Sequence, residues 1–255
     1  MESLEFKEID DWALGMGHSA LVIPLVSLVP FVPSLQSALR GIKMPIIAKN
    51  NDVITVIIIF AVEPERQQEL IDNIVEFLET GVKHQPGFVS SNIHKSIDGV
   101  RVMNYAQWKT QEDYQAFVNN SEIRKLGAKV FQFHIHESHV YEVVVSLPDD
   151  ATLKITKGGL IHLAEFRVKP ENQQRLVELE REYLPLGLQN PGLLSGNFHR
   201  SLDGVHNVNY GQWRSFADFE ELLKDPKYAP LGKYWQGLAE NEFHLYEVVF
   251  TEPAD

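Results

Sequence analysis

Apolar residues follow strand-like and helix-like patterns in an order that the chain contains twice. A run of β-branched and apolar residues at 53–62 predicts a buried strand, and 160–168 predicts the same later in the chain. Each run is followed by a proline suited to a helix start and then by apolar residues at helical spacing. These patterns predict a strand and an amphipathic helix in each half of the chain.

The strongest pattern is a doubled segment in which two short apolar runs flank a turn. Residues 87–108 read GFVSSNIHKSIDGVRVMNYAQW and residues 192–213 read GLLSGNFHRSLDGVHNVNYGQW, with matched positions 105 apart. The Asp-Gly pair at the centre of each copy favours a two-residue turn with positive φ. We therefore predict one β-hairpin in each copy of an internal repeat.

The segments after the hairpins complete the repeat. A hydroxyl residue three positions before an aspartate indicates a capped helix start after each hairpin, and an alternating pattern predicts a last strand in each half. These features are Thr110 with Asp113 and Ser215 with Asp218, a buried stripe of Tyr114, Phe117 and Val118 in the first copy, and strands at 139–145 and 244–250. The order β-α-β-β-α-β, present twice, predicts an α+β fold of two ferredoxin-like repeats. Because one face of each sheet needs cover, we expect the repeats to pair as an intramolecular, pseudo-dimeric barrel.

The repeat divides the chain into four parts. We predict an N-terminal extension at 1–51, a first domain at 52–146, a linker at 147–158 and a second domain at 159–255. The extension has no counterpart in the second half. Its apolar stretch at 20–33 is too short to span a membrane and contains three prolines, so we expect it to cover apolar surface or to form a lid.

Composition excludes several classes of function. The formal net charge of -12 argues against a nucleic-acid partner, which requires a clustered positive surface. The absence of cysteine excludes a disulfide framework, a thiolate nucleophile and a zinc-thiolate site, and it fits a reducing cytoplasm. We therefore expect a cytoplasmic globular protein with neither a nucleic-acid nor a membrane partner.

The doubled hairpin resembles the antibiotic biosynthesis monooxygenase family, in which small α+β barrel proteins usually carry one copy per chain and dimerise. The resemblance rests on PGFVSSNIHKSIDGVRVMNYAQW and PGLLSGNFHRSLDGVHNVNYGQW and extends over both halves. It implies a tandem, two-domain member of the dimeric α+β barrel superfamily. The two-domain chain is itself a candidate for pairing as a homodimer.

The resemblance also implies an activity. Family members that oxygenate aromatic polyketide intermediates work without flavin, haem or metal, so this chain is expected to be a cofactor-independent monooxygenase of secondary metabolism. Dioxygen is then the co-substrate, and the substrate is a hydrophobic aromatic or quinol-type small molecule. The family's site residues fall on Asn104, Trp108 and Tyr114 in the first copy and on Asn209 and Trp213 in the second. Phe219 replaces the tyrosine in the second copy and the family's arginine has no clear match, so we expect the first half to be active if only one is.

These residue types suit the implied chemistry. An asparagine amide can donate to a developing oxyanion, and a tryptophan supplies a flat wall and one N–H donor. Asparagine and tryptophan four apart on a strand face the same way and can line one pocket, although either can also be a core residue. His94 and His199 are candidate proton carriers, while their polar strand face also fits a hydrated interface between sheets. Tyr105 and Tyr210 lie on the opposite strand face from the asparagines, and we interpret them as packing residues.

Other assignments are weaker. His134, His136 and His139 cluster near the last strand of the first half, but the second half keeps only His244, so a duplicated metal site is excluded and we predict no metal ligand. Haem degradation is disfavoured because relatives with that activity carry a histidine on the helix after the tryptophan, and residues 109–130 contain none.

Two alternatives stay open: a non-catalytic small-molecule-binding or scaffold protein, and an isomerase or cyclase using the same pocket.

Overall fold

The structure is a computed structural model that describes residues 46–49, 52–148 and 154–253. The first repeat contains β1 (Ile54–Ala61), α3 (Gln67–Thr80), β2 (Phe88–Ser96), β3 (Arg101–Trp108), α4 (Gln111–Asn119), α5 (Ser121–Leu126) and β4 (His134–Leu147). The second repeat contains β5 (Leu160–Val168), α6 (Pro170–Gly187), β6 (Leu193–Ser201), β7 (His206–Trp213), α7 (Phe216–Lys224) and β8 (Ala239–Pro253). Short 3-10 turns lie at Pro64–Arg66, Val82–His84, Gly127–Lys129 and Pro226–Gly232. The predicted β-α-β-β-α-β order is confirmed in both repeats.

The described strands close a single antiparallel barrel in the order β1-β3-β2-β8-β5-β7-β6-β4. The last strand of each repeat pairs with the first strand of its own repeat and with the hairpin of the other, β8 with β2 and β4 with β6. These exchanges complete the backbone pairing, so the closed sheet has no free edge. The predicted pseudo-dimeric barrel is confirmed.

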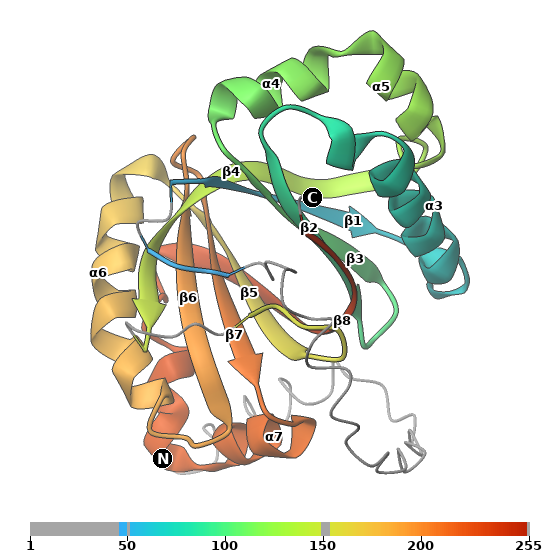
Figure 1. The fold of residues 1–255 in the computed structure, drawn as a ribbon. Coiled ribbons are helices and arrows are strands. Elements are labelled where there is room, and N and C mark those ends of the chain that lie inside the picture. The colour runs from blue at the N-terminus through green and yellow to red at the C-terminus, as the bar shows by residue number, and fades with distance from the viewer. Residues whose placement is uncertain (1–45, 50–51, 149–153, 254–255) are drawn as a thin grey trace, which may run out of the picture. The chain divides into compact units, whose positions relative to one another are not determined.

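Helices cover the outer face of the barrel on two sides. Figure 1 shows α3, α4 and α5 over the strands of the first repeat, and α6 and α7 over those of the second. Strand alternation divides the side chains accordingly. Met103 and Tyr105 of β3 belong to the interior cluster, whereas Val102 and Ala106 pack outward beneath α3.

Two short segments before β1 and β5 also enter the barrel. Ile47 and Ile155 belong to the interior apolar cluster. The amide of Gln107 donates to the Ile46 carbonyl over 3.1 Å, and that of Gln212 donates to the Lys154 carbonyl over 3.1 Å. The residues just before β1 thus match those just before β5, which the sequence comparison did not detect. The rest of the predicted extension, and residues 149–153 of the predicted linker, lie outside the described residues.

The hairpin turns are longer than predicted. Four residues, 97–100, separate β2 from β3, rather than two. Gly99 has the predicted positive φ of 85°. The Ser96 hydroxyl accepts from the Arg101 N–H over 2.8 Å, and a carboxylate oxygen of Asp98 accepts from the Val100 N–H over 3.2 Å. These side chains satisfy backbone donors that a two-residue turn would pair directly, which explains the difference.

The helix starts follow the prediction more closely. The Thr110 hydroxyl accepts from the Asp113 N–H over 3.0 Å, and the Ser215 hydroxyl accepts from the Asp218 N–H over 3.2 Å. Val118 was predicted to be buried and is instead exposed. The reason is that α4 ends at Asn119 and the chain enters α5, whose buried Ile123 takes the place against the core.

None of the helices in the described part of the chain combines the length and apolarity that crossing a membrane requires.

Candidate functional site

The helix-covered face of β3 carries the first predicted asparagine and tryptophan. Val102, Asn104, Ala106 and Trp108 alternate on this face, and Asn104 is the partly exposed residue among otherwise buried neighbours. Asn104 accepts a hydrogen bond at Oδ1 from the Ser91 hydroxyl over 2.6 Å. The structure therefore places Asn104 and Trp108 on one face, in the space between sheet and helices.

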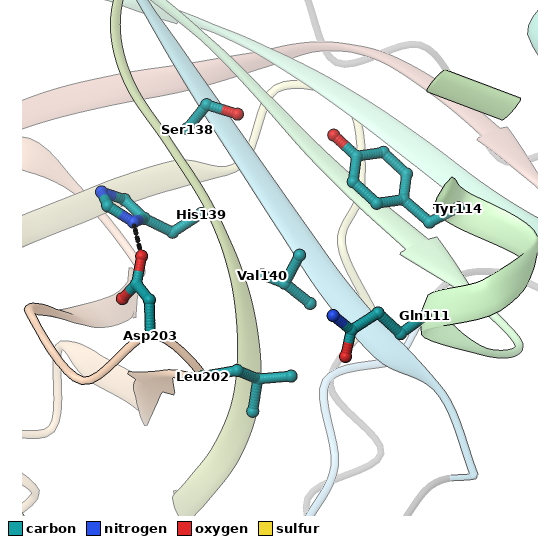
Figure 2. A pocket seen from close by; sticks show the side chains of 7 residues that line it. All are labelled: Gln111, Tyr114, Ser138, His139, Val140, Leu202 and Asp203. Carbon is teal, nitrogen blue, oxygen red and sulfur yellow. Dashed lines mark hydrogen bonds and ion pairs between the residues drawn. The ribbon is translucent and has the colours of Figure 1, made fainter. Parts of the chain in front are cut away.

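Aromatic rings enclose Trp108. Its ring centroid lies 5.7 Å from that of Phe88, 5.7 Å from that of Tyr114 and 4.9 Å from that of Phe117. Burial raises the pKa of Tyr114, and its side chain lines a cavity of about 330 Å³. Figure 2 shows this cavity between Tyr114 and the Leu202–Asp203 turn of the other repeat. The structure thus brings Trp108 and Tyr114 together.

The equivalent face of the second repeat contains a buried carboxylate. Glu180 of α6 accepts a hydrogen bond at Oε1 from the Asn209 amide over 2.8 Å, and it accepts another at Oε2 from the Tyr234 hydroxyl. Burial raises the pKa of Glu180 to about 7, although the hydrogen bond from Tyr234 opposes this shift. A carboxyl group whose pKa lies near neutrality can take up and release a proton at physiological pH.

Further polar atoms on this face have no partner. Both side-chain polar atoms of Asn207, the Oδ1 of Asn209 and the Nε1 of Trp213 are buried without a hydrogen bond to any described residue. Buried polar groups are nearly always paired, because leaving one unpaired costs about 1–3 kcal/mol. These residues share the face of β7 that carries Asn209, the partner of Glu180, so this face offers donors and acceptors to a polar ligand.

The first repeat has other residues at three of these polar positions. Its counterparts of Glu180, Asn207 and Tyr234 are Ile74, Val102 and Lys129. Ile74 and Val102 belong to one continuous apolar cluster that also contains Trp108. The apolar residues beneath the second-repeat helices instead form two clusters, one around Leu176 and Leu184 and one around Trp213 and Phe219.

Sequence reasoning missed Glu180, although a signal was present. The apolar stripe of α6 continues through Leu176, Val177, Tyr183 and Leu184, and Glu180 occupies the position on that stripe where α3 has Ile74. A charged residue on the buried face of an amphipathic helix is unusual unless it is paired. Aligning the two helices position by position would have identified it.

Phe219 fills the place of Tyr114 without a hydroxyl. Its ring lies 5.2 Å from that of Trp213 and 5.1 Å from that of His162. Burial lowers the pKa of His162 to about 4, so its ring is neutral near pH 7. An apolar aromatic wall therefore lies beside Trp213, at the other end of β7 from Asn207.

His94 and His199 lie inside the barrel, on the opposite sheet face from the asparagines and tryptophans. The Nε2 of His94 is 2.9 Å from the Tyr210 hydroxyl, and that of His199 is 2.9 Å from the Tyr105 hydroxyl, so each bond joins the two repeats. Each Nδ1 faces a backbone carbonyl, 3.0 Å away for His94 and 3.1 Å for His199. Nδ1 must then donate and Nε2 accept. Burial lowers the pKa of both rings to about 4. The structure does not bring these histidines to the asparagine–tryptophan face, and it packs Tyr105 and Tyr210 in the interior.

The structure also groups residues that could hold a metal. Of the three histidines considered from sequence, His139 lies with Glu137 and His206, and the three offer donor atoms within 4.8 Å of one another. His206 comes from the second repeat, so spacing along the chain did not reveal this group.

Comparison with known proteins agrees with the fold and with the repeat. The model of the antibiotic biosynthesis monooxygenase family matches residues 53–129 and again residues 159–229. An anthrone oxidase-like protein of known structure superposes with a TM-score of 0.71 at 23% identity, covering 82% of this chain and 97% of its own. A candidate monooxygenase from Fusobacterium nucleatum superposes with a TM-score of 0.57 at 10% identity, covering 79% of this chain and 94% of its own. At these identities the likeness shows the fold alone.

A sequence relative is more specific. Tetracenomycin-F1 monooxygenase from Streptomyces glaucescens is 44% identical over 73 residues, which are 29% of this chain and 65% of the relative. The family model matches both repeats and more than half of the residues. The chain therefore belongs to the antibiotic biosynthesis monooxygenase family.

Proposed function

We propose that the protein is a cofactor-independent monooxygenase that oxidises a hydrophobic aromatic or quinol-type molecule with dioxygen in secondary metabolism. The observation that carries the proposal is the buried Glu180 carboxylate, hydrogen-bonded to Asn209 on the face that also bears Trp213. Family membership and the likeness to tetracenomycin-F1 monooxygenase support the reaction class.

The chemistry needs few protein groups. For an anthrone, a base removes a proton from the ring CH2 group, and the resulting anion transfers one electron to dioxygen. The radical and superoxide then combine to form a peroxide, which loses water and leaves a carbonyl, so that one anthrone and one O2 give one quinone and one water. The protein must supply a base, a donor to the anionic substrate oxygen and an aromatic wall.

The second repeat offers all three. Glu180 is the base, because its pKa near 7 leaves it largely ionised in slightly alkaline solution. The amide of Asn207 and the Nε1–H of Trp213 are both unpaired, and because they lie toward opposite ends of β7 they are alternative donors to the substrate oxygen. Comparing the two repeats in sequence favours the first as the active one, because it has Tyr114 where the second has Phe219. The buried proton acceptor Glu180, hydrogen-bonded to Asn209, instead favours the second.

The test is oxygen consumption by the purified full chain, free of flavin and metal, with an anthrone or a hydroquinone. We expect one O2 consumed per quinone formed, and a large loss of rate in Glu180→Gln. Saturable binding without oxygen consumption would support the binding or scaffold alternative. Conversion of the ligand under nitrogen at an unchanged rate would support an isomerase or cyclase.

A further inference from the structure

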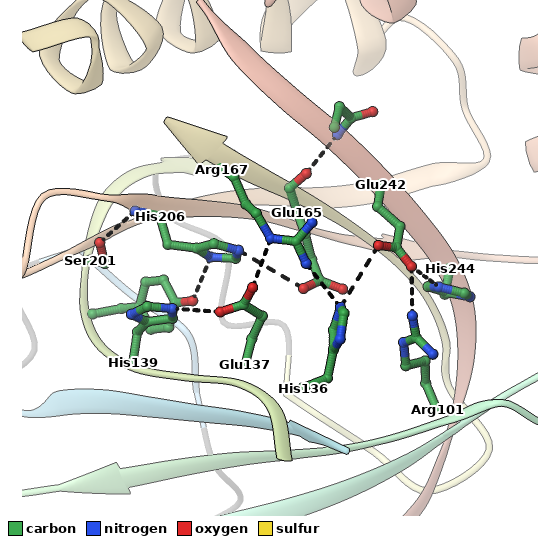
Figure 3. A network of polar contacts seen from close by, with 12 residues as sticks. Arg101, His136, Glu137, His139, Glu165, Arg167, Ser201, His206, Glu242 and His244 are labelled. Carbon is green, nitrogen blue, oxygen red and sulfur yellow. Dashed lines mark hydrogen bonds and ion pairs between the residues drawn. The ribbon is translucent and has the colours of Figure 1, made fainter. Parts of the chain in front are cut away.

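A second polar cluster lies at one end of the barrel and joins the two repeats (Figure 3). Glu137 and His139 come from β4, and His206 begins β7. The two imidazole rings are stacked, with centroids 4.8 Å apart and planes 9° apart. The Nε2 of His139 lies 2.9 Å from Oε2 of Glu137. The proposed oxygenation does not use these side chains.

Buried atoms in this cluster lack partners. The Nε2 of His206 and both carboxylate oxygens of Glu165 have no hydrogen bond to any described residue, and these side chains are 2% and 3% exposed. The Nε2 of His206 and Oε2 of Glu165 are 4.0 Å apart. Leaving buried polar atoms unpaired is costly, and a bound group that contacts the Nε2 of His206 would remove this cost.

The Nδ1 atom of each imidazole has a hydrogen-bond partner. The Nδ1 of His139 lies 2.7 Å from a carboxylate oxygen of Asp203, and the Nδ1 of His206 lies 2.8 Å from the Tyr141 hydroxyl. With Nδ1–H donated to the Tyr141 oxygen, the Nε2 of His206 carries a lone pair. The Nε2–H of His139 donates to Glu137, and a bound metal ion would replace that proton. Metal-binding histidines are oriented in this way by their other ring nitrogen.

The other repeat supplies an internal comparison. Asp98, His244 and Glu242 stand 105 positions from Asp203, His139 and Glu137 and make the same chain of contacts. The counterpart of His206 is Arg101, whose guanidinium donates to Glu242 over 2.8 Å. Each cluster thus has a guanidinium on its glutamate, Arg101 on Glu242 and Arg167 on Glu137, but at the position of Arg101 the first cluster has an imidazole with an unpaired nitrogen.

Charge and access also favour a cation. Arg167 donates to Oε1 of Glu137 over 2.8 Å, which leaves Oε2 turned to His139. The carboxylates of Glu137 and Asp203, which both contact His139, outnumber this guanidinium, so a bound cation would offset the remaining negative charge. A cavity of about 550 Å³, lined by Glu137, His139 and His206 among others, gives access from solvent.

We propose that Glu137, His139 and His206 bind one divalent transition-metal ion, with zinc as the first ion to test. Two imidazole nitrogens and a carboxylate form a donor set that suits zinc or iron and leaves a position for water, with Glu165 beside it. In a tetrahedral site, bonds of about 2.1 Å place neighbouring ligand atoms about 3.4 Å apart, so donor atoms within 4.8 Å must approach one another by up to roughly 1.4 Å through side-chain rotation. The ion would link β4 of one repeat to β7 of the other, on the sheet face opposite Asn209.

The experiment is zinc titration of the chelator-treated full chain by calorimetry, together with thermal unfolding with and without zinc. We expect one zinc per chain and a higher unfolding temperature with zinc. His206→Arg copies the arrangement around Arg101 and should lower the affinity at least about 100-fold with an unchanged circular dichroism spectrum. Asp203→Asn should weaken binding by about 10- to 100-fold.

His244→Ala is the matched control and should leave zinc affinity unchanged. If His206→Arg does not fold, His206→Gln provides the same test with a smaller side chain. The proposal is overturned if zinc does not saturate at one ion per chain, if a folded His206 variant binds as tightly as the wild type, or if His244→Ala weakens binding equally.

Discussion

The Asn209 amide donates a hydrogen bond to Glu180 over 2.8 Å, tying β7 to a carboxylate that is only 1% exposed beneath α6. The matching asparagine of the first repeat, Asn104, is instead bonded to the Ser91 hydroxyl. Two copies of one hairpin therefore present the same amide in different electrostatic surroundings. We expect the two repeats to differ in function for that reason.

Glu180→Gln should stabilise the protein at alkaline pH. The pKa of Glu180 is about 7 in the folded protein and near 4.5 without burial, so between these values the unfolded chain loses its proton first. The wild-type free energy of unfolding should then fall by roughly 1.4 kcal/mol per pH unit from 4.5 to 7. Glutamine removes this pH-dependent contribution and keeps the size of the side chain. Urea denaturation at pH 5 and pH 8 measures the free energy of unfolding of both proteins. If the difference in free energy between the wild type and Glu180→Gln is the same at both pH values, the pKa of Glu180 is not raised.

The same substitution should lower activity. A base with a pKa near 7 makes the oxidation rate rise with pH through about 7. Glu180→Gln should reduce kcat by about 100-fold or more and abolish this rise. Initial rates of oxygen consumption between pH 5.5 and 8.5 provide the measurement. A variant that keeps the wild-type pH profile would remove Glu180 from the reaction.

Paired substitutions distinguish the repeats. Asn209→Ala and Trp213→Phe should each reduce the rate by about 100-fold, as expected when a donor to a developing oxyanion or its orienting partner is lost. Asn104→Ala and Trp108→Phe are the matched changes and should have smaller effects, because the first repeat has Ile74 in place of Glu180. Rates measured on all four variants with one substrate decide the question. A reversed order would assign the activity to the first repeat, where Tyr114 lies.

Asn207→Val should increase stability and weaken ligand binding. Both polar atoms of Asn207 are buried and unpaired, and the first repeat has Val102 at the same position. Removing an unpaired polar group should raise the free energy of unfolding by about 1–3 kcal/mol. Chemical denaturation measures the stability, and fluorescence titration with an anthrone measures binding. The opposite exchange, Val102→Asn, should destabilise the protein without improving binding.

The interior histidines should make the fold sensitive to acid. The pKa of His94 is about 4 when buried, compared with 6.5 for a free imidazole, so the unfolded chain binds a proton first as pH falls. Stability should decrease from pH 6.5 toward pH 4, by about 1.4 kcal/mol per pH unit for this residue, and then level off. His94→Gln should have a shallower slope than the wild type. Parallel slopes in denaturation experiments would show that His94 does not titrate in this way.

Much of the fold is encoded in local pattern. The period-two and helical spacings, the Asp-Gly turns and the hydroxyl caps predict nearly every element, because each depends on residues close together in the chain. The pairing of two repeats follows from the uncovered sheet face. The turn length and the exposure of Val118 were predicted wrongly, because side-chain acceptors and the start of α5 act beyond those local patterns.

The sequence alone determined two ferredoxin-like repeats, their pairing and the position of Asn104, Trp108, Asn209 and Trp213 on one strand face. Only the tertiary structure showed that His94 and His199 lie on the other face, that Glu180 meets Asn209, and that His139 meets His206. Each of these relationships joins residues from different elements, and its burial depends on how helices and repeats pack. Hydrophobic periodicity specifies which face of an element is buried, whereas the partner that a buried polar group finds there is decided by packing.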